Sequence, residues 1–199
     1  DLTLRYQQFL MALEKGNKER IKEAEVLIRS LVAHAEIVTE YGNIIVNPEF
    51  KLRVTHHDTK ISNVLFDKDG KGLCVIDLDT VMPGYFISDV GDMMRTYLSP
   101  VSEEEKELEK IEVRDEFYKA IVEGYYNEMK EELTETEKKY FFYAGTFMIY
   151  MQALRFLTDY LNDDIYYGAK YPRHNFMRAK NQLVLLEQLL KKKDQLVGI

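Results

Sequence analysis

The sequence lacks several features that common classes of protein require. Its only cysteine is Cys74, which excludes an intrachain disulfide and fits a reducing, cytoplasmic compartment. Its net charge is −7, whereas a general nucleic-acid binder usually carries a basic excess. The longest charge-free stretch, Tyr140 to Leu154, is short for a membrane span, and no signal segment opens the chain. We therefore expect neither a nucleic-acid nor a membrane partner.

Apolar periodicity predicts that most of the chain is helical. Helical spacing of apolar residues runs through residues 2–15, 18–41, 88–97, 115–130, 134–161 and 175–193. Gly42 is a stop signal for the second helix, and Ser88 is a suitable cap for the third. Thr134 and Glu137 match a capping box. We see no repeat or linker, so residues 1–199 are predicted to form one domain.

The pattern changes between residues 52 and 84. Three short segments have strand character: 52–56, 64–66 and 73–76. The residues DKDGKG separate the last two segments and indicate a hairpin. Cys74 is predicted to be a buried strand residue, and Met82–Gly84 a loop. The predicted fold is mainly α, with a small β hairpin inserted at the site.

Polar residues occur at kinase-like offsets within this region. They are His56, Asp58, Lys60, Asn63, Asp77 and Asp79. Phosphoryl transfer to a hydroxyl needs a carboxylate that orients the alcohol and accepts its proton. It also needs Asn and Asp oxygens that hold Mg²⁺. The order of these residues therefore predicts a reaction class.

Each of these residues also has an ordinary structural explanation. Asp58, the proposed base, could be a turn cap. The presence of Lys60 and Asn63 at kinase-like offsets from it favours the catalytic role. Lys60 would place a cation on the transferred phosphate, although most lysines are simply exposed.

The proposed metal ligands are Asn63 and Asp77. Val75 and Ile76 precede Asp77 and should be buried, so this carboxylate needs a metal or a salt bridge to neutralise it. Asp79 would bind the same ion or a second one, or support the ligands.

Other polar residues are predicted to support the site. His56 is expected to orient the loop, and His57 to be incidental. Asp89 and Asp92 lie three residues apart at a helix start, where they can cap the helix or brace the catalytic loop.

The quoted segments THHDTKISNVLFDKDG, VIDLDTVMPG and DVGDMMR resemble the aminoglycoside phosphotransferase/choline kinase superfamily, whose fold is kinase-like. Within it, the chain looks most like N-acetylhexosamine 1-kinases, which have similar later stretches, here RFLTDYLNDDIYY and YPRHNFMRAKNQ. The resemblance implies that Asp58 is the base and that Asn63 and Asp77 bind Mg²⁺. It also implies that Arg155 and Tyr166 contact the sugar.

The chain departs from this family's pattern in one large respect. Kinases of this type have an N-terminal lobe with a phosphate-covering loop and a strand lysine, and nothing before Asp58 resembles either. We therefore expect residues 1–199 to be the C-terminal lobe of a longer kinase, poorly active by itself.

The resulting expectation is an ATP- and Mg²⁺-dependent kinase acting on a small hydroxylated metabolite. The favoured acceptor is the anomeric hydroxyl of N-acetylglucosamine or N-acetylgalactosamine. Choline, homoserine or an aminoglycoside are alternatives, since an acidic acceptor pocket would favour a polycation. A non-catalytic binding module of the same fold is the rival from another class.

Overall fold

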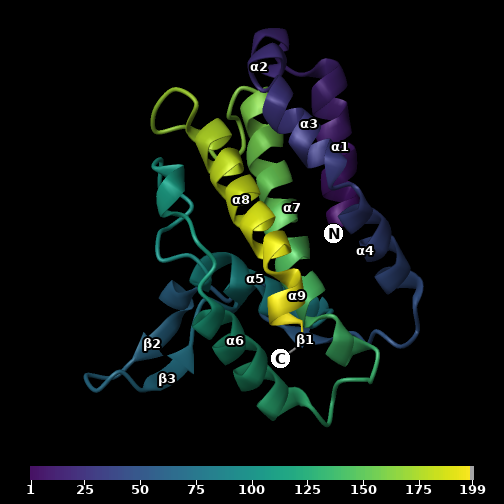
Figure 1. The fold of residues 1–199 in the computed structure, drawn as a ribbon, viewed down its shortest axis with the longest axis vertical. Helices are drawn as coiled ribbons and strands as arrows, with labels where there is room; N and C mark the ends of the chain where they lie inside the picture. Colours follow the sequence, from purple (N-terminus) through teal and green to yellow (C-terminus); the bar gives the residue numbers. More distant parts are fainter. Residues whose placement is uncertain (198–199) are drawn as a thin grey trace.

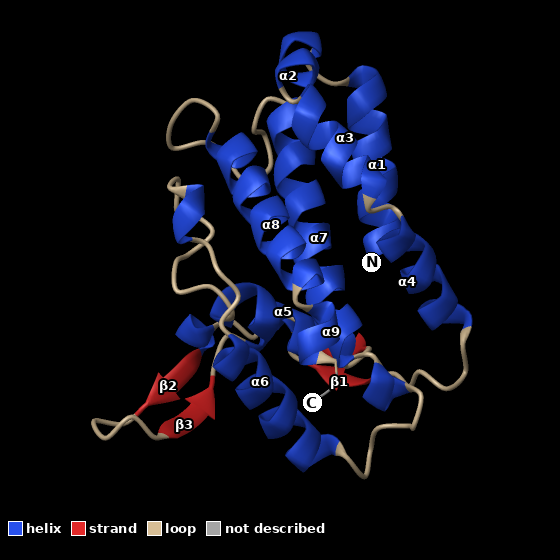
Figure 2. Ribbon diagram, in the orientation of Figure 1, coloured by secondary structure: helices blue, strands red, loops and turns tan. Residues whose placement is uncertain are grey.

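The structure, a computed structural model, describes residues 1–197 and is mainly helical (Figure 1). Its helices are α1 (Leu2–Lys15), α2 (Lys18–Glu23), α3 (Glu25–Ala33), α4 (Glu36–Val46), α5 (Ile87–Tyr97), α6 (Asp115–Met129), α7 (Phe141–Leu161), α8 (His174–Lys191) and α9 (Lys193–Leu196). Its strands are β1 (Arg53–Thr55), β2 (Val64–Phe66), β3 (Gly72–Val75) and β4 (Met82–Gly84), in two small sheets (Figure 2). The predicted fold class, a mainly α lobe of kinase-like type, is confirmed.

The helix α7 forms the centre of the molecule. Its charge-free stretch is mostly buried, and α8, α5 and α1 pack around it (Figure 1). Burial of apolar surface on all sides supplies the main stabilisation of such a helix. Within residues 1–197, no helix combines the length and the apolar character that a membrane crossing requires.

Close packing of α5 on α7 depends on Gly91. A Cβ at this position would collide with the carbonyl oxygen of Ala144 and with Cβ of Met148. Glycine therefore lets α5, which carries two of the predicted site residues, lie directly against the core helix.

The predicted single helix over residues 18–41 is wrong, because three helices occupy this region. The chain bends after Ala24 and again between α3 and α4, and Gly42 lies inside α4 instead of ending a helix. Two tyrosine hydroxyls of α7 donate to carbonyls beside the second bend: Tyr150 to Leu31 (2.9 Å) and Tyr143 to Ile37 (2.8 Å). Because of the two bends, the apolar faces of α2, α3 and α4 can each pack against α7. One straight helix over the same residues would point away from α7 after a few turns.

The hairpin of β2 and β3 is present as predicted, but its environment is not. Cys74 is exposed, and so are Val75 and Ile76, which were expected to be buried. The hairpin projects from the helices (Figure 2), and Val75 and Ile76 are 50% and 37% exposed. Met82–Gly84 is also not a loop, since it pairs antiparallel with β1.

Two helix starts differ in detail from the prediction. The helix α5 begins at Ile87, and Ser88 does not cap it, because its hydroxyl bonds to the ring of His57 (2.7 Å). Thr134 and Glu137 do form the reciprocal capping bonds, at 3.0 and 2.9 Å. A 3₁₀ turn, Glu137–Lys139, then precedes α7.

Candidate active site

The segment after β1 is held in place by Asp89 on α5. The two carboxylate oxygens of Asp89 accept from the amides of His56 (2.9 Å) and His57 (2.8 Å). Its carbonyl oxygen accepts from the hydroxyl of Thr59 (2.8 Å). Asp89 therefore ties the loop that carries Asp58 to the helix that packs on the core.

The ring of His56 joins this loop to the hairpin. Its Nε2 bonds to the carbonyl oxygen of Ile76 (2.9 Å), and its Nδ1 accepts from the amide of Asp58 (3.3 Å). These partners require the tautomer with a proton on Nε2. The ring thus fixes the separation between Asp58 and the residue before Asp77.

His57, expected to be incidental, is part of the scaffold. It has left-handed backbone geometry, with φ of 67°. Its ring bonds to the hydroxyls of Thr55 (2.7 Å) and Ser88 (2.7 Å). A non-glycine residue keeps this conformation only where its surroundings enforce it. The sequence gave no indication that His56 and His57, although adjacent, bond to different parts of the site.

Asp58 is a half-buried carboxylate with one occupied and one open oxygen. Its Oδ2 accepts from Nζ of Lys60 (2.7 Å) and from Nδ2 of Asn63 (2.8 Å). Burial acts to raise the pKa of Asp58, but the bonds from Lys60 and Asn63 outweigh it, and the pKa is lowered. Within residues 1–197, no donor reaches its Oδ1. The ionised carboxylate is therefore free to accept from an alcohol through that oxygen.

The amide of Asn63 is oriented by the same loop. Its Nδ2 donates both to the carbonyl oxygen and to Oδ2 of Asp58, each at 2.8 Å, and two acceptors fix which end is nitrogen. Its Oδ1 has no donor among the described residues. Because the backbone oxygen of Asn63 accepts from Ile76 (2.9 Å), this amide lies beside the end of β3.

Asp77 and Asp79 form a carboxylate pair at the end of β3. Asp77 has left-handed geometry (φ 65°), and both residues are exposed. A hydrogen bond with Asp79 and the charge of Asp79 raise the pKa of Asp77. Two carboxylates that resist joint ionisation, beside a free amide oxygen, suit a hard cation such as Mg²⁺, which takes few protein ligands. No group of three or more His, Cys, Asp or Glu residues in the described chain forms a metal site by itself.

A cavity of about 570 Å³ opens beside Asp58. Lys60, Asp92, Arg95, Glu103, Gln152, Arg155, Tyr167 and Arg178 are among its lining residues. Asn63, Asp77 and Asp79 are not among its lining residues, although Asn63 bonds to Asp58, which is. Of the two predicted sugar contacts, Arg155 lines this cavity, whereas Tyr166 does not. Tyr166 is 70% exposed and lines a neighbouring depression instead.

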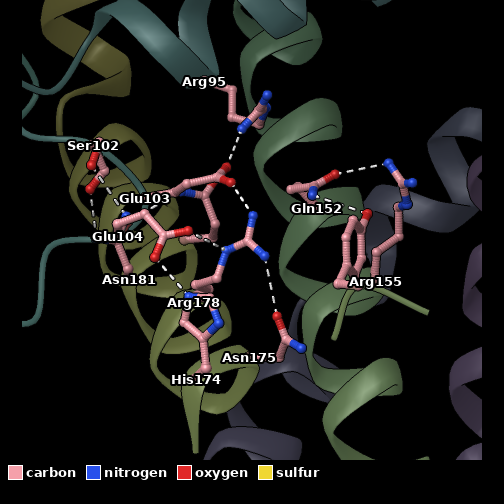
Figure 3. Close-up of polar contacts among 12 residues, drawn as sticks. Arg95, Ser102, Glu103, Glu104, Gln152, Arg155, His174, Asn175, Arg178 and Asn181 are labelled. Carbon is pink, nitrogen blue, oxygen red and sulfur yellow. Dashed lines mark hydrogen bonds and ion pairs between the residues drawn. The ribbon is translucent and has the colours of Figure 1, made fainter. Parts of the chain in front are cut away.

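One wall of the cavity is a chain of ion pairs that the sequence did not predict (Figure 3). Arg95 bonds to Asp92 (2.9 Å) and Glu103 (2.5 Å), and Glu103 also pairs with Arg178. Glu104 extends the network to His174 (2.6 Å). Glu103 and Glu104 lie in a run of charged residues of ordinary solvated composition, yet both pair with residues of α8. No local pattern in this glutamate-rich run indicates partners 70 to 75 residues away.

Arg155 stands apart from that wall. Its NH1 donates to Oε1 of Gln152 (3.0 Å), and Nε2 of Gln152 donates to the hydroxyl of Tyr167 (3.2 Å) (Figure 3). Its guanidinium lies 5.3 Å from the ring centre of Tyr167. No carboxylate of residues 1–197 pairs with it, so its charge is available to the cavity.

Together, these features define a class of site: an ionised carboxylate steadied by a lysine and an asparagine, a separate acidic pair suited to a cation, and a polar cavity. These are groups that phosphoryl transfer uses. A family comparison agrees, because the model of the Phosphotransferase enzyme family (APH) matches residues 2–132. The chain belongs to this family. The match includes the loop and the hairpin, while Arg155 and Arg178 lie beyond it.

Proposed function

We propose that this chain is the acceptor-binding, C-terminal lobe of an ATP- and Mg²⁺-dependent small-molecule kinase. Its best-supported acceptor is the anomeric hydroxyl of N-acetylglucosamine or N-acetylgalactosamine, giving the sugar 1-phosphate. One observation carries the proposal: Oδ1 of Asp58 is open while Oδ2 is held by Lys60 and Asn63. Membership of the family supports ATP and Mg²⁺ as its general cofactors.

The chain's own groups suggest how the reaction proceeds. The acceptor hydroxyl donates to Oδ1 of Asp58, which orients the attacking oxygen and takes its proton. As that oxygen bonds to the γ-phosphorus of ATP, the bond from this phosphorus to the β–γ bridging oxygen breaks and ADP leaves. Lys60 keeps Asp58 ionised, and its own pKa is raised, first by the bond to Asp58. Asn63 and Asp77, with Asp79 beside them, would hold the metal. Bound Mg²⁺ supplies charge neutralisation on the nucleotide phosphates.

The charge of the cavity bears on the choice of acceptor. Its lining carries four cationic side chains (Lys60, Arg95, Arg155 and Arg178) and four carboxylates (Asp1, Asp58, Asp92 and Glu103). Glu103 is already shared by two arginines, so it cannot attract a cationic ligand strongly. A polycationic aminoglycoside needs an acidic pocket. The balance therefore favours a neutral, polar acceptor such as a sugar over an aminoglycoside or choline.

The exposed hairpin supports the idea of a second lobe. Leu65, Leu73, Val75, Ile76 and Leu78 are between 37% and 62% exposed beside the proposed metal ligands. Several exposed large apolar side chains next to a polar site are the kind of surface that a ligand or another domain can cover. We propose that nucleotide and an N-terminal lobe cover this face, and that residues 1–199 alone turn over poorly.

The acceptor is tested by ³¹P NMR on the full-length protein. Mg²⁺, ATP and a panel of N-acetylhexosamines, choline, homoserine and an aminoglycoside are supplied one acceptor at a time. We expect a new sugar 1-phosphate signal only with the N-acetylhexosamines. Transfer to choline, homoserine or the aminoglycoside instead would support kinase activity and refute a sugar as the acceptor. No transfer to any acceptor would favour a non-catalytic module.

A further inference from the structure

Asp92 is a buried carboxylate with an unpartnered oxygen. Its side chain is 5% exposed, and Oδ1 takes both bonds from Arg95, from Nε and from the terminal nitrogen, each at 2.9 Å. Its Oδ2 is buried and has no hydrogen-bond partner. A buried carboxylate oxygen without a donor is costly, so its presence calls for a ligand or another explanation.

The obvious structural explanation is incomplete. Asp92 was expected to cap α5 or brace the catalytic loop, yet it makes no cap bond and lies in the second turn of the helix. Burial raises the pKa of Asp92, against the lowering effects of Arg95 and of the Thr59 backbone. No hydrogen bond from Thr59 reaches Oδ2 with acceptable geometry. The bracing of the loop is done by Asp89.

The position of Asp92 is suited to contact with an acceptor. It lines the same cavity as Asp58 and Lys60, one turn of α5 beyond Asp89. Arg95 does not neutralise it fully, because Arg95 is shared with Glu103 (Figure 3). Glu103 is in turn fixed by Arg178 on α8. These pairs hold Oδ1 of Asp92, while Oδ2 has no partner in the described chain.

We propose that Oδ2 of Asp92 accepts a hydrogen bond from a second hydroxyl of the acceptor, distinct from the hydroxyl that is phosphorylated. The inference rests on the proposed function. Asp92 is then a specificity-determining residue that selects acceptors with at least two suitably spaced hydroxyls. A bond from a neutral hydroxyl to a charged, desolvated oxygen is strong enough to discriminate between acceptors.

The test pairs one substitution with a series of acceptors. The KM of N-acetylglucosamine and of its 3-, 4- and 6-deoxy analogues is measured with wild-type full-length protein and with Asp92→Asn. In the wild type, loss of one particular hydroxyl should raise KM about tenfold or more. In Asp92→Asn, KM for the parent sugar should rise by a similar factor and should no longer depend on that hydroxyl. The KM for ATP should stay within about twofold.

Two further proteins make the test decisive. Glu107→Gln removes an exposed carboxylate that pairs only with Lys110 in the described chain, and should leave every KM unchanged. Asp92→Glu keeps the charge and its pairing with Arg95 but displaces the oxygen, so it should lose the same discrimination if Asp92→Asn does not fold.

A merely structural role predicts a different pattern. KM values that rise equally for every deoxy analogue, or do not change, would overturn the inference while the sugar remains an acceptor. Wild-type protein that ignores all N-acetylhexosamines but phosphorylates choline, homoserine or an aminoglycoside would refute the acceptor in the proposed function, and this inference with it.

Discussion

At the scale of single residues, the site is organised around backbone conformations that are unfavourable in isolation. His57 and Asp77 both have left-handed geometry, at φ of 67° and 65°, and they flank Asp58 and Asn63. Such conformations cost about 1–3 kcal/mol each and persist only when the surroundings enforce them. Asp89 enforces the first through two amide bonds, so it should matter more than its distance from the reacting groups suggests.

Substitution of Asp89 tests whether its carboxylate positions the loop, because an effect on kcat can be compared with the effect on thermal stability. Asp89→Ala leaves the amides of His56 and His57 without acceptors, and we expect kcat to fall by about 10²-fold because the position of Asp58 is no longer fixed. Steady-state kinetics and thermal melting are the measurements. An unchanged kcat in a folded Asp89→Ala protein would show that the carboxylate does not position the loop.

The sequence predicted the residues of this loop better than it predicted their neighbours. The spacing of Asp58, Lys60 and Asn63 lies within one short segment, so local pattern was sufficient to bring them together. The wall of Arg95, Glu103 and Arg178 joins three separate segments of the chain. No local pattern specifies such a pairing, and these residues come together only because α5 and α8 both pack on α7.

At the scale of elements, a buried ion pair connects β1 to the start of α7. The carboxylate of Glu137 is fully buried and accepts from Arg53 (2.7 and 2.8 Å) and from the amides of Lys51 and Thr134, both at 2.9 Å. Burial acts to raise the pKa of Glu137, but the bond from Arg53 and the amide bonds outweigh it, so the pKa is lowered. The strand that leads to the catalytic loop is thereby fixed to the core helix.

Glu137→Gln should destabilise the protein by about 3 kcal/mol, because it leaves Arg53 buried with an uncompensated charge. Because the folded pKa is below the unfolded value, the contribution of Glu137 is complete above a pH of about 4.3 and is lost as the pH falls through the lower folded pKa. Urea unfolding at several pH values measures it. A difference between wild type and variant that stays constant down to the lowest pH would contradict this account.

Prediction of the elements succeeded where apolar periodicity runs without a break through one helix. It failed where tertiary packing determines the bends and the strand pairing. The helices over 2–15 and 115–130 were predicted within a residue. The region 18–41 has continuous helical periodicity, and its bends come from the shape of α7. Met82–Gly84 has the composition of a loop, yet its backbone pairs with β1. Pro83 is tolerated there because it lies in a two-stranded sheet with a free edge.

At the scale of the whole molecule, the hairpin is the least covered part of the described chain. The sequence predicted a buried hairpin because its apolar runs resemble those of buried strands. Such runs do not indicate whether another element covers them. The helices instead pack around α7 and leave the hairpin projecting (Figure 1). This arrangement suits a surface completed by a second lobe.

Amide hydrogen exchange can test that arrangement. We expect the amides of β2 and β3 to exchange at least tenfold more slowly in the full-length protein with ATP than in residues 1–199 alone, because covering the apolar face stabilises the hairpin. The amides of α7 serve as the internal control and should exchange at similar rates in both. Equal rates for the hairpin would contradict a covering lobe.

The central claim is that Asp58 receives the proton of the acceptor hydroxyl. The most direct measurement is the single-turnover rate of phosphate transfer in full-length Asp58→Asn, with acceptor and ATP affinities measured in parallel. The account predicts a rate about 10²- to 10⁴-fold below wild type, with both affinities changed only a few-fold. A rate within about threefold of wild type would contradict the role of Asp58 and with it the proposed chemistry of this site.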